Sequence, residues 1–179
     1  ANGPTWTDNS QDRHDQRPTQ GGYSDRIVVS DRFVLRLPES LDLKGAAPLL
    51  CAGITLWSPL RHWKAGPGMQ VAIVGLGGLG HMGLKLAKAM GAEVTLFTRS
   101  PGKEADARRL GANAVVLSTD AEAMKKVRSR FDLIVDTVPN AHDLNLYVPT
   151  LALDGTLVLV GYLGGLEPAV HSVPLIVGR

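Results

Sequence analysis

This chain of 179 residues is poor in the features that mark secreted, membrane-spanning and nucleic-acid-binding proteins. It has one cysteine, which excludes an internal disulfide and fits a reducing compartment, so we expect a cytoplasmic protein. No apolar run approaches the roughly 18 residues of a transmembrane helix, and we expect no signal peptide. The formal net charge of +2 indicates neither a nucleic acid nor a membrane as partner.

The remaining composition is that of a globular domain. Hydrophobic residues make up 44% of the chain and charged residues 20%, which predicts one domain with a core and a small appendage. The basic run at residues 125–130 has no interleaved aromatic residues. We therefore interpret it as the solvated face of a helix and not as a nucleic-acid site.

The most informative segment is residues 71–80, where an apolar strand runs into G-x-G-x-x-G and then into a helix. In this context Gly75 allows the tight turn, Gly77 lets a pyrophosphate approach the backbone, and Gly80 lets the helix pack on the sheet. The N–H groups and the dipole at the helix start favour phosphates. The segment predicts a dinucleotide site, with contacts from Gly75, Leu76, Gly77, Gly78, Leu79 and Gly80.

The next strand, residues 93–97, ends without the acidic residue that an NAD-binding unit usually carries there for the ribose 2′-hydroxyl. Thr98, Arg99 and Ser100 follow instead, with Lys103 close behind. A 2′-phosphate suits a guanidinium, an ammonium and two hydroxyls, whereas a carboxylate would repel it. The sequence therefore predicts NADP. The alternative is that Arg99 and Lys103 are solvated charges near a helix start.

Strands and helices alternate through the second part of the chain, which predicts a doubly wound parallel sheet, the Rossmann type of α/β fold. We expect strands at residues 71–74, 94–97, 114–117, 133–135 and 156–160. We expect helices at residues 78–90, 103–110, 121–130 and 141–152. Because such a sheet usually has six strands, we expect the sixth beyond residue 179 and interpret the chain as part of a longer protein.

The first part of the chain has a different pattern. Residues 1–22 are polar and are predicted to be loop or disordered. Residues 23–29 and 33–38 are predicted to be short strands of an antiparallel, β-rich domain, and an apolar helix is predicted over residues 46–60. We therefore assign residues 1–44 to the C-terminal remnant of a first, catalytic domain. Residues 45–179 are assigned to the NADP-binding domain, with its last strand missing.

Five linked motifs extend from Gly21 through most of the chain. They are residues 21–24 (GGYS), 47–55 (APLLCAGIT), 75–83 (GLGGLGHMG), 136–139 (DTVP) and 154–157 (DGTL). In order and spacing they resemble the cinnamyl-alcohol-dehydrogenase-like branch of the zinc-dependent medium-chain alcohol dehydrogenases. The resemblance implies an NADP-dependent enzyme that reversibly oxidises a primary alcohol to an aldehyde, with a hydride passing to or from nicotinamide C4.

The resemblance also implies a catalytic zinc. In that family a cysteine and a histidine of the first domain hold the metal, with a further cysteine at the position of Cys51. Zinc then acts as a Lewis acid on the carbonyl or alkoxide oxygen. Without the family context, Cys51 would be interpreted as a buried, inert thiol. The family's other zinc ligands are absent from these residues, so we expect this chain alone to be inactive.

The resemblance assigns further residues to the coenzyme. Thr55 would lie one helical turn after Cys51, near the nicotinamide; alternatively, it bonds its own i−4 carbonyl. Thr137 would lie on the adenosine side of the crevice. The end of the fifth strand would meet the nicotinamide carboxamide through Leu159, Val160 and Gly161.

For other polar and aromatic residues the sequence leaves alternatives open. Asp136 ends a strand and has either a catalytic role or a helix-capping or loop-fixing role, and His81 either contacts a phosphate or faces solvent. Trp57 and Trp63 are expected to pack in the core or against the first domain. The histidines without metal-like spacing, which we expect to face solvent or lie in loops, are His14, His62, His142 and His171.

The leading hypothesis is therefore the coenzyme-binding part of an NADP- and zinc-dependent alcohol dehydrogenase or aldehyde reductase. Its substrate would be a small alcohol or aldehyde, and the full-length protein would be a homodimer. A second hypothesis is an NADP-binding module without catalysis. A third is a zinc-free reductase of the same superfamily, against which Cys51 argues.

Overall fold

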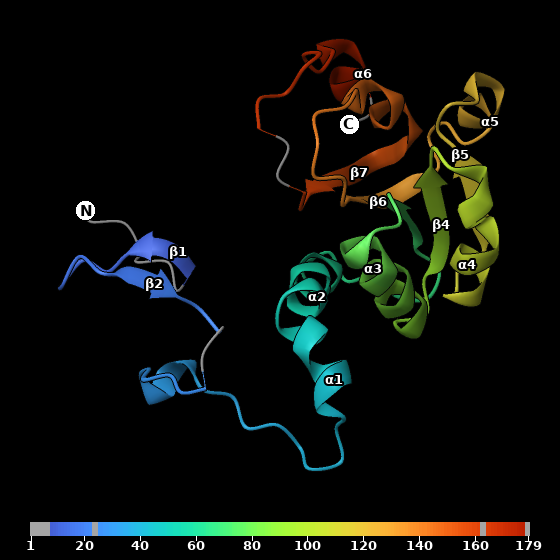
Figure 1. Cartoon of the computed structure of the whole chain (residues 1–179). Helices are drawn as coiled ribbons and strands as arrows, with labels where there is room; N and C mark the ends of the chain where they lie inside the picture. The colour runs from blue at the N-terminus through green and yellow to red at the C-terminus, as the bar shows by residue number, and fades with distance from the viewer. Residues whose placement is uncertain (1–7, 23–24, 162–163, 178–179) are drawn as a thin grey trace. The chain divides into compact units, whose positions relative to one another are not determined.

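The computed structural model describes residues 8–22, 25–161 and 164–177, and the chain divides into two compact units, Ala1–Leu41 and Asp42–Arg179 (Figure 1). In the first unit, β1 (Asp8–Gln11) and β2 (Pro18–Gln20) form an antiparallel hairpin. The prediction of loop or disorder was therefore wrong for this part of residues 1–22. Thr19 joins the two strands, because its hydroxyl accepts from the N–H of Ser10 and donates to the Ser10 carbonyl.

The strands predicted at residues 23–29 and 33–38 were wrong where the structure describes them; Tyr23 and Ser24 lie outside the described residues. A 3₁₀ turn, η1 (Asp31–Phe33), interrupts a segment without regular structure. Val28 is fully exposed and Phe33 is 85% exposed. A strand needs a paired neighbour and a face to bury, and these side chains have no such surface within the described part of the chain.

The second unit is built on a five-stranded sheet in the order β5-β4-β3-β6-β7, with all neighbours parallel. Its strands are β3 (Gln70–Val74), β4 (Glu93–Thr98), β5 (Ala114–Leu117), β6 (Phe131–Asp136) and β7 (Leu151–Leu159). This confirms the predicted doubly wound fold. The direction of the strand order reverses between β3 and β6, and ligands of such sheets bind in the crevice at the carboxyl ends of the strands at that point.

Side chains of the central strands alternate between two cores. Val71 and Ile73 face the side covered by α2 (Ala52–His62), α3 (Gly78–Ala89) and α4 (Glu104–Arg109). Ala72 and Val74 face the opposite side, with Phe97, Phe131 and Tyr147 around them. Figure 1 shows α3 and α4 beside the strands. The sheet is thus buried on both faces, as parallel sheets require.

Two predicted helices differ from the structure. Residues 141–152 form two 3₁₀ turns, η4 (Leu144–Leu146) and η5 (Val148–Thr150), and then enter β7. Pro149 has no N–H to donate, and Thr150 already bonds back to Tyr147, so a continuous helix does not form. The helix predicted to reach residue 130 is shorter, because α5 spans Ala121–Lys125.

The apolar helix predicted over residues 46–60 is broken into three pieces. They are α1 (Leu43–Ala46), η2 (Ala47–Leu50) and α2. The break lies at Cys51, where φ is −121° and ψ is −78°, close behind Pro48. On α2 Trp57 is 43% exposed, and Trp63, directly after the helix, is 37% exposed. Of the two expected placements, packing in this unit's core is therefore wrong, and packing against the first domain stays a prediction.

The carboxyl end of the second unit carries α6 (Ser172–Val177), a single short helix after β7. Throughout the parts of the chain that the structure describes, no helix is long and apolar enough to cross a membrane.

Candidate functional site

The glycine loop between β3 and α3 is shaped by the two glycines that have no room for a side chain. Gly75 has φ +87°, and its N–H donates to the Phe97 carbonyl, which holds the turn against the end of β4. A Cβ at Gly80 would lie 2.0 Å from the carbonyl oxygen of Gly75. The first turn of α3 therefore lies directly on the loop because Gly80 has no side chain.

The two glycines at the tip of the loop have free space next to their backbone, where a side chain would lie. A Cβ on Gly77 or Gly78 would meet no atom within 4 Å. Gly77 is the N-cap of α3, a helix of 12 residues, so the free N–H groups and the positive dipole end point into this space. The geometry suits a phosphate or pyrophosphate placed against the backbone.

The end of β4 supplies hydroxyls and cations beside the loop. Thr98 is buried, and its hydroxyl accepts a hydrogen bond of 3.1 Å from the N–H of Ser100. Arg99, Ser100 and Lys103 are exposed. The ammonium of Lys103 donates to the carbonyl of Leu76 at 2.9 Å, so it lies over the glycine loop.

A cavity of about 190 Å³ brings the predicted loop and strand-end residues together. We call it the β4–β6 pocket, because it lies between the ends of those strands. No aspartate or glutamate is among its lining residues, so its charged lining is cationic. The lining residues are Val74, Gly75, Leu76, Phe97, Thr98, Arg99, Ser100, Lys103, Ser118, Val138, Asn140, Ala141, His142 and Tyr147.

A second cavity, of about 520 Å³, lies along the other side of the glycine loop. It shares Leu76 and Lys103 with the β4–β6 pocket, and Pro48 and Ala52 contribute from η2 and α2. His81 also lines it and is exposed. Residues on either side of Cys51 thus line the same cavity as the glycine loop.

The segment after β6 carries the other wall of the β4–β6 pocket. The hydroxyl of Thr137 is buried and donates to the Val74 carbonyl at 2.7 Å, so Thr137 supports the glycine loop from beneath. Asp136 is fully buried; its Oδ1 accepts from the N–H of Val138 at 3.0 Å and its Oδ2 lies 2.8 Å from Nε2 of His142. Asp136 therefore fixes this loop.

Sequence reasoning missed four polar residues of this pocket, Ser118, Asn140, His142 and Tyr147, together with its apolar lining apart from Leu76. His142 lies in a loop, which is one of the two expected placements, but it does not face solvent: its side chain is 16% exposed and joined to Asp136. Burial raises the pKa of the Tyr147 hydroxyl, against the opposing effect of its hydrogen bond with Ser118. No spacing rule points to these four polar residues, because they come from three separate segments, after β5, after β6 and after η4, which only the fold brings together.

The residues predicted to meet the nicotinamide carboxamide lie at the end of β7. The backbone N–H groups of Val160 and Gly161 both donate to the Asp136 carbonyl, at 2.9 and 3.2 Å. Leu159, the last residue of β7, is in register with Asp136. These residues lie next to the switch point but outside the β4–β6 pocket.

The described residues do not complete a metal site. Cys51 is exposed, and no cluster of three or more histidine, cysteine, aspartate or glutamate side chains able to hold a metal occurs in the described ranges. One thiolate is too few for zinc, which takes at least three protein ligands.

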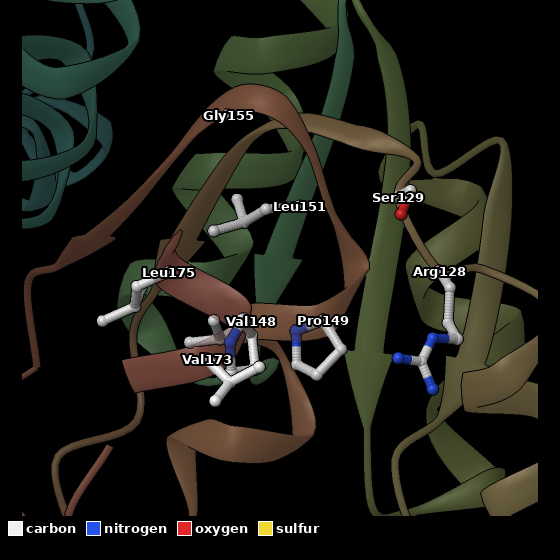
Figure 2. A pocket seen from close by; sticks show the side chains of 9 residues that line it. Arg128, Ser129, Val148, Pro149, Leu151, Gly155, Val173 and Leu175 are labelled. Atoms are coloured by element: carbon white, nitrogen blue, oxygen red, sulfur yellow. The ribbon is translucent and has the colours of Figure 1, made fainter. Parts of the chain in front are cut away.

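A third cavity, of about 280 Å³, lies away from the predicted site residues. Figure 2 shows Arg128 and Ser129 on one side of it, with Val148, Pro149 and Val173 on the other. None of its lining residues belongs to the glycine loop or to the end of β4. It has no cofactor assignment.

The chain is similar to known proteins over most of its length. The family described as zinc-binding dehydrogenase matches residues 78–179. An NADP-dependent alcohol dehydrogenase of Mycolicibacterium smegmatis is 55% identical over 159 residues, which are 89% of this chain and 45% of the relative. The chain thus spans about half the length of the curated relatives it matches.

Two solved structures are similar over most of the chain. A cinnamyl alcohol dehydrogenase of Sorghum bicolor is 45% identical with a TM-score of 0.90, covering 95% of this chain and 49% of the other. The enzyme from Helicobacter pylori, solved in complex with NADP(H), is 41% identical with a TM-score of 0.80, covering 88% of this chain and 44% of that one.

Proposed function

The chain belongs to the zinc-binding dehydrogenases, and from that premise we propose that its second unit binds NADP(H) for a reversible alcohol–aldehyde oxidoreduction carried out by a longer protein. The observation that carries the proposal is the cationic, acid-free β4–β6 pocket beside the open glycine loop. A 2′-phosphate fits this lining, whereas the ribose 2′-hydroxyl of NAD would find no carboxylate partner there.

Within this proposal, each part of the crevice holds one part of the coenzyme. Residues 75–80 bind the pyrophosphate through backbone N–H groups, with Leu76, Gly78 and Leu79 at the contact. Thr98, Arg99, Ser100 and Lys103 bind the 2′-phosphate. Thr137 lies on the adenosine side, Thr55 near the nicotinamide, and Leu159, Val160 and Gly161 at the carboxamide. The bound coenzyme supplies a hydride at C4, and the chain's residues orient it.

We further propose that the longer protein acts on a small primary alcohol or aldehyde as a cytoplasmic homodimer. In the described part of the second unit β7 is an edge strand, where the sixth strand expected in the longer protein would pair. Cys51 is proposed as one zinc ligand of the longer protein, because it lies in the family's ligand-type context beside the glycine loop. The described residues alone do not hold that metal.

Coenzyme titration tests the proposal directly. We expect the 179-residue chain to bind NADPH more tightly than NADH by about one to three decades, because hydrogen bonds to a charged group are worth roughly 1.5–3 kcal/mol each. Quenching of protein fluorescence or isothermal calorimetry measures both affinities. Equal affinities would contradict the assignment of Arg99 and Lys103, and no binding of either coenzyme would contradict the proposed function.

Metal analysis tests whether this chain supplies only one of the zinc ligands, with the others in the rest of the longer protein. We expect the chain, incubated with zinc and desalted, to keep no stoichiometric metal and to reduce no aldehyde with NADPH, because one thiolate does not retain zinc. The variant Cys51→Ser is the matched control and should give the same metal content. If the chain keeps one zinc and Cys51→Ser loses it, the assignment of the other ligands to the rest of the longer protein is wrong.

A further inference from the structure

The side chain of His142 has an acceptor opposite each of its ring nitrogens. Nε2 lies 2.8 Å from the Asp136 carboxylate and Nδ1 lies 2.8 Å from the carbonyl oxygen of Asn140. A neutral imidazole has one N–H, which serves one of these two acceptors and leaves the other facing a lone pair. Both contacts are hydrogen bonds only if the Asp136–His142 couple holds one proton more than a neutral imidazole beside an ionised carboxylate.

That additional proton can lie on either residue of the couple. Either His142 is doubly protonated beside a carboxylate, or Asp136 is protonated and donates to Nε2 while Nδ1–H donates to Asn140. In both arrangements the couple is neutral as a whole and all its hydrogen bonds are made. Without the proton the couple carries one negative charge, and the contact with either Asp136 or Asn140 becomes repulsive.

We propose that Asp136 and His142 form a proton-holding couple that fastens one wall of the β4–β6 pocket, so that the coenzyme binds best while the couple is protonated. The inference rests on the proposed function, because it assigns the adenosine end of the coenzyme to this pocket. The wall is the segment from Val138 to His142, and His142 is the group that joins its Asn140 carbonyl to the strand end.

The surroundings of the couple favour the protonated form. Asp136 is fully buried, and desolvation raises the pKa of its carboxyl, against hydrogen bonds from the Val138 N–H and His142. Because this pKa is raised, the fastened wall is stable at low pH and is lost as pH rises through the couple's own pKa. Of the ionisable groups around it, Tyr147 lies with its ring against that of His142, and Arg99 and Lys103 line the same pocket. Asp143 acts on Tyr147.

Replacing Asp136 by asparagine keeps the hydrogen bonds of the couple but removes the carboxyl group that takes up and releases the proton. The asparagine oxygen still accepts from the Val138 N–H, and its amide donates to Nε2 of a neutral His142, whose Nδ1–H then serves Asn140. Asp136→Asn therefore keeps the wall fastened without a titrating proton. His142→Ala instead removes both contacts. His171, exposed and outside the pocket lining, provides the matched control His171→Ala.

The experiment is NADPH binding by the 179-residue chain from about pH 5.5 to 8.5, a range that spans the charge change of histidines. Relative to Asp136→Asn, we expect the wild-type affinity to fall about three- to tenfold with rising pH, the worth of one net hydrogen bond. His142→Ala should bind weakly throughout, and His171→Ala should follow the wild type. The comparison at each pH cancels the titration of the 2′-phosphate itself.

A constant ratio between wild type and Asp136→Asn, or wild-type affinity in His142→Ala, would overturn the proposal. Thermal unfolding of each variant shows whether it is folded. Nitrogen-15 NMR of the coenzyme-free chain gives a second readout, in which we expect a protonated Nδ1 of His142 at about pH 6, and an unprotonated Nδ1 there would also overturn it. If no protein binds NADPH, the proposed function fails, while an unprotonated Nδ1 in the NMR measurement would still overturn the couple by itself.

Discussion

Replacing Gly80 with alanine is expected to abolish detectable NADPH binding and to lower the free energy of unfolding by about 1–3 kcal/mol or more. The new Cβ would lie 2.0 Å from the carbonyl oxygen and 2.9 Å from the carbonyl carbon of Gly75, both backbone atoms that cannot rotate away. Either the loop or α3 must move, and each movement takes the phosphate-facing N–H groups out of position. Denaturant unfolding and NADPH titration measure the two effects.

Gly77→Ala is the matched control, since it adds the same methyl group in the same loop. No atom lies within 4 Å of that Cβ, and φ at Gly77 is −106°, which any residue adopts. The fold should therefore keep its stability, while NADPH binding weakens because the methyl group occupies the space proposed for the pyrophosphate. If Gly80→Ala binds NADPH as the wild type does, or if Gly77→Ala is as unstable as Gly80→Ala, the assignment of the two glycines is wrong.

The parts of the fold that the sequence predicted are those that depend on local pattern. The strand from Gln70 to Val74 is uniformly apolar after its first residue, and a parallel strand buried on both faces requires such a run. The glycine spacing after it then located the loop and α3. The predicted strands at residues 23–29 and 33–38 instead alternated in part between apolar and polar residues, but alternation gives no strand without a paired neighbour.

The missed parts of the site depend on contacts that no local pattern encodes. His142 meets Asp136 only because the chain turns back over the end of β6, and Tyr147 enters the pocket because η4 replaces the predicted helix. Pro149 was a readable signal against that helix. The pairing of His142 with Asp136 had no comparable signal, because a spacing of six residues in a loop does not fix a contact.

The second large effect is expected from Arg99→Asp, which should turn the preference of the chain from NADPH toward NADH. The arginine is exposed at the end of β4 and lines the β4–β6 pocket, where its charge also acts on Tyr147. Its loss removes a charge-assisted hydrogen bond worth about 1.5–3 kcal/mol, or roughly ten- to hundredfold in NADPH affinity. The new carboxylate repels a 2′-phosphate and accepts from a 2′-hydroxyl.

Two further variants separate the causes of that change. Arg99→Gln removes the cation without adding an acid, so it should lower NADPH affinity and leave NADH affinity unchanged. Arg128→Asp makes the same charge change at a residue that lines the cavity of Figure 2, and it should change neither the NADPH affinity nor the NADH affinity. An equal fall in both affinities in Arg99→Asp would mean general damage to the pocket. If NADH affinity rises in Arg99→Asp and in neither of the other two variants, the new carboxylate must contact the ribose. The adenosine end of the coenzyme would then lie at the end of β4.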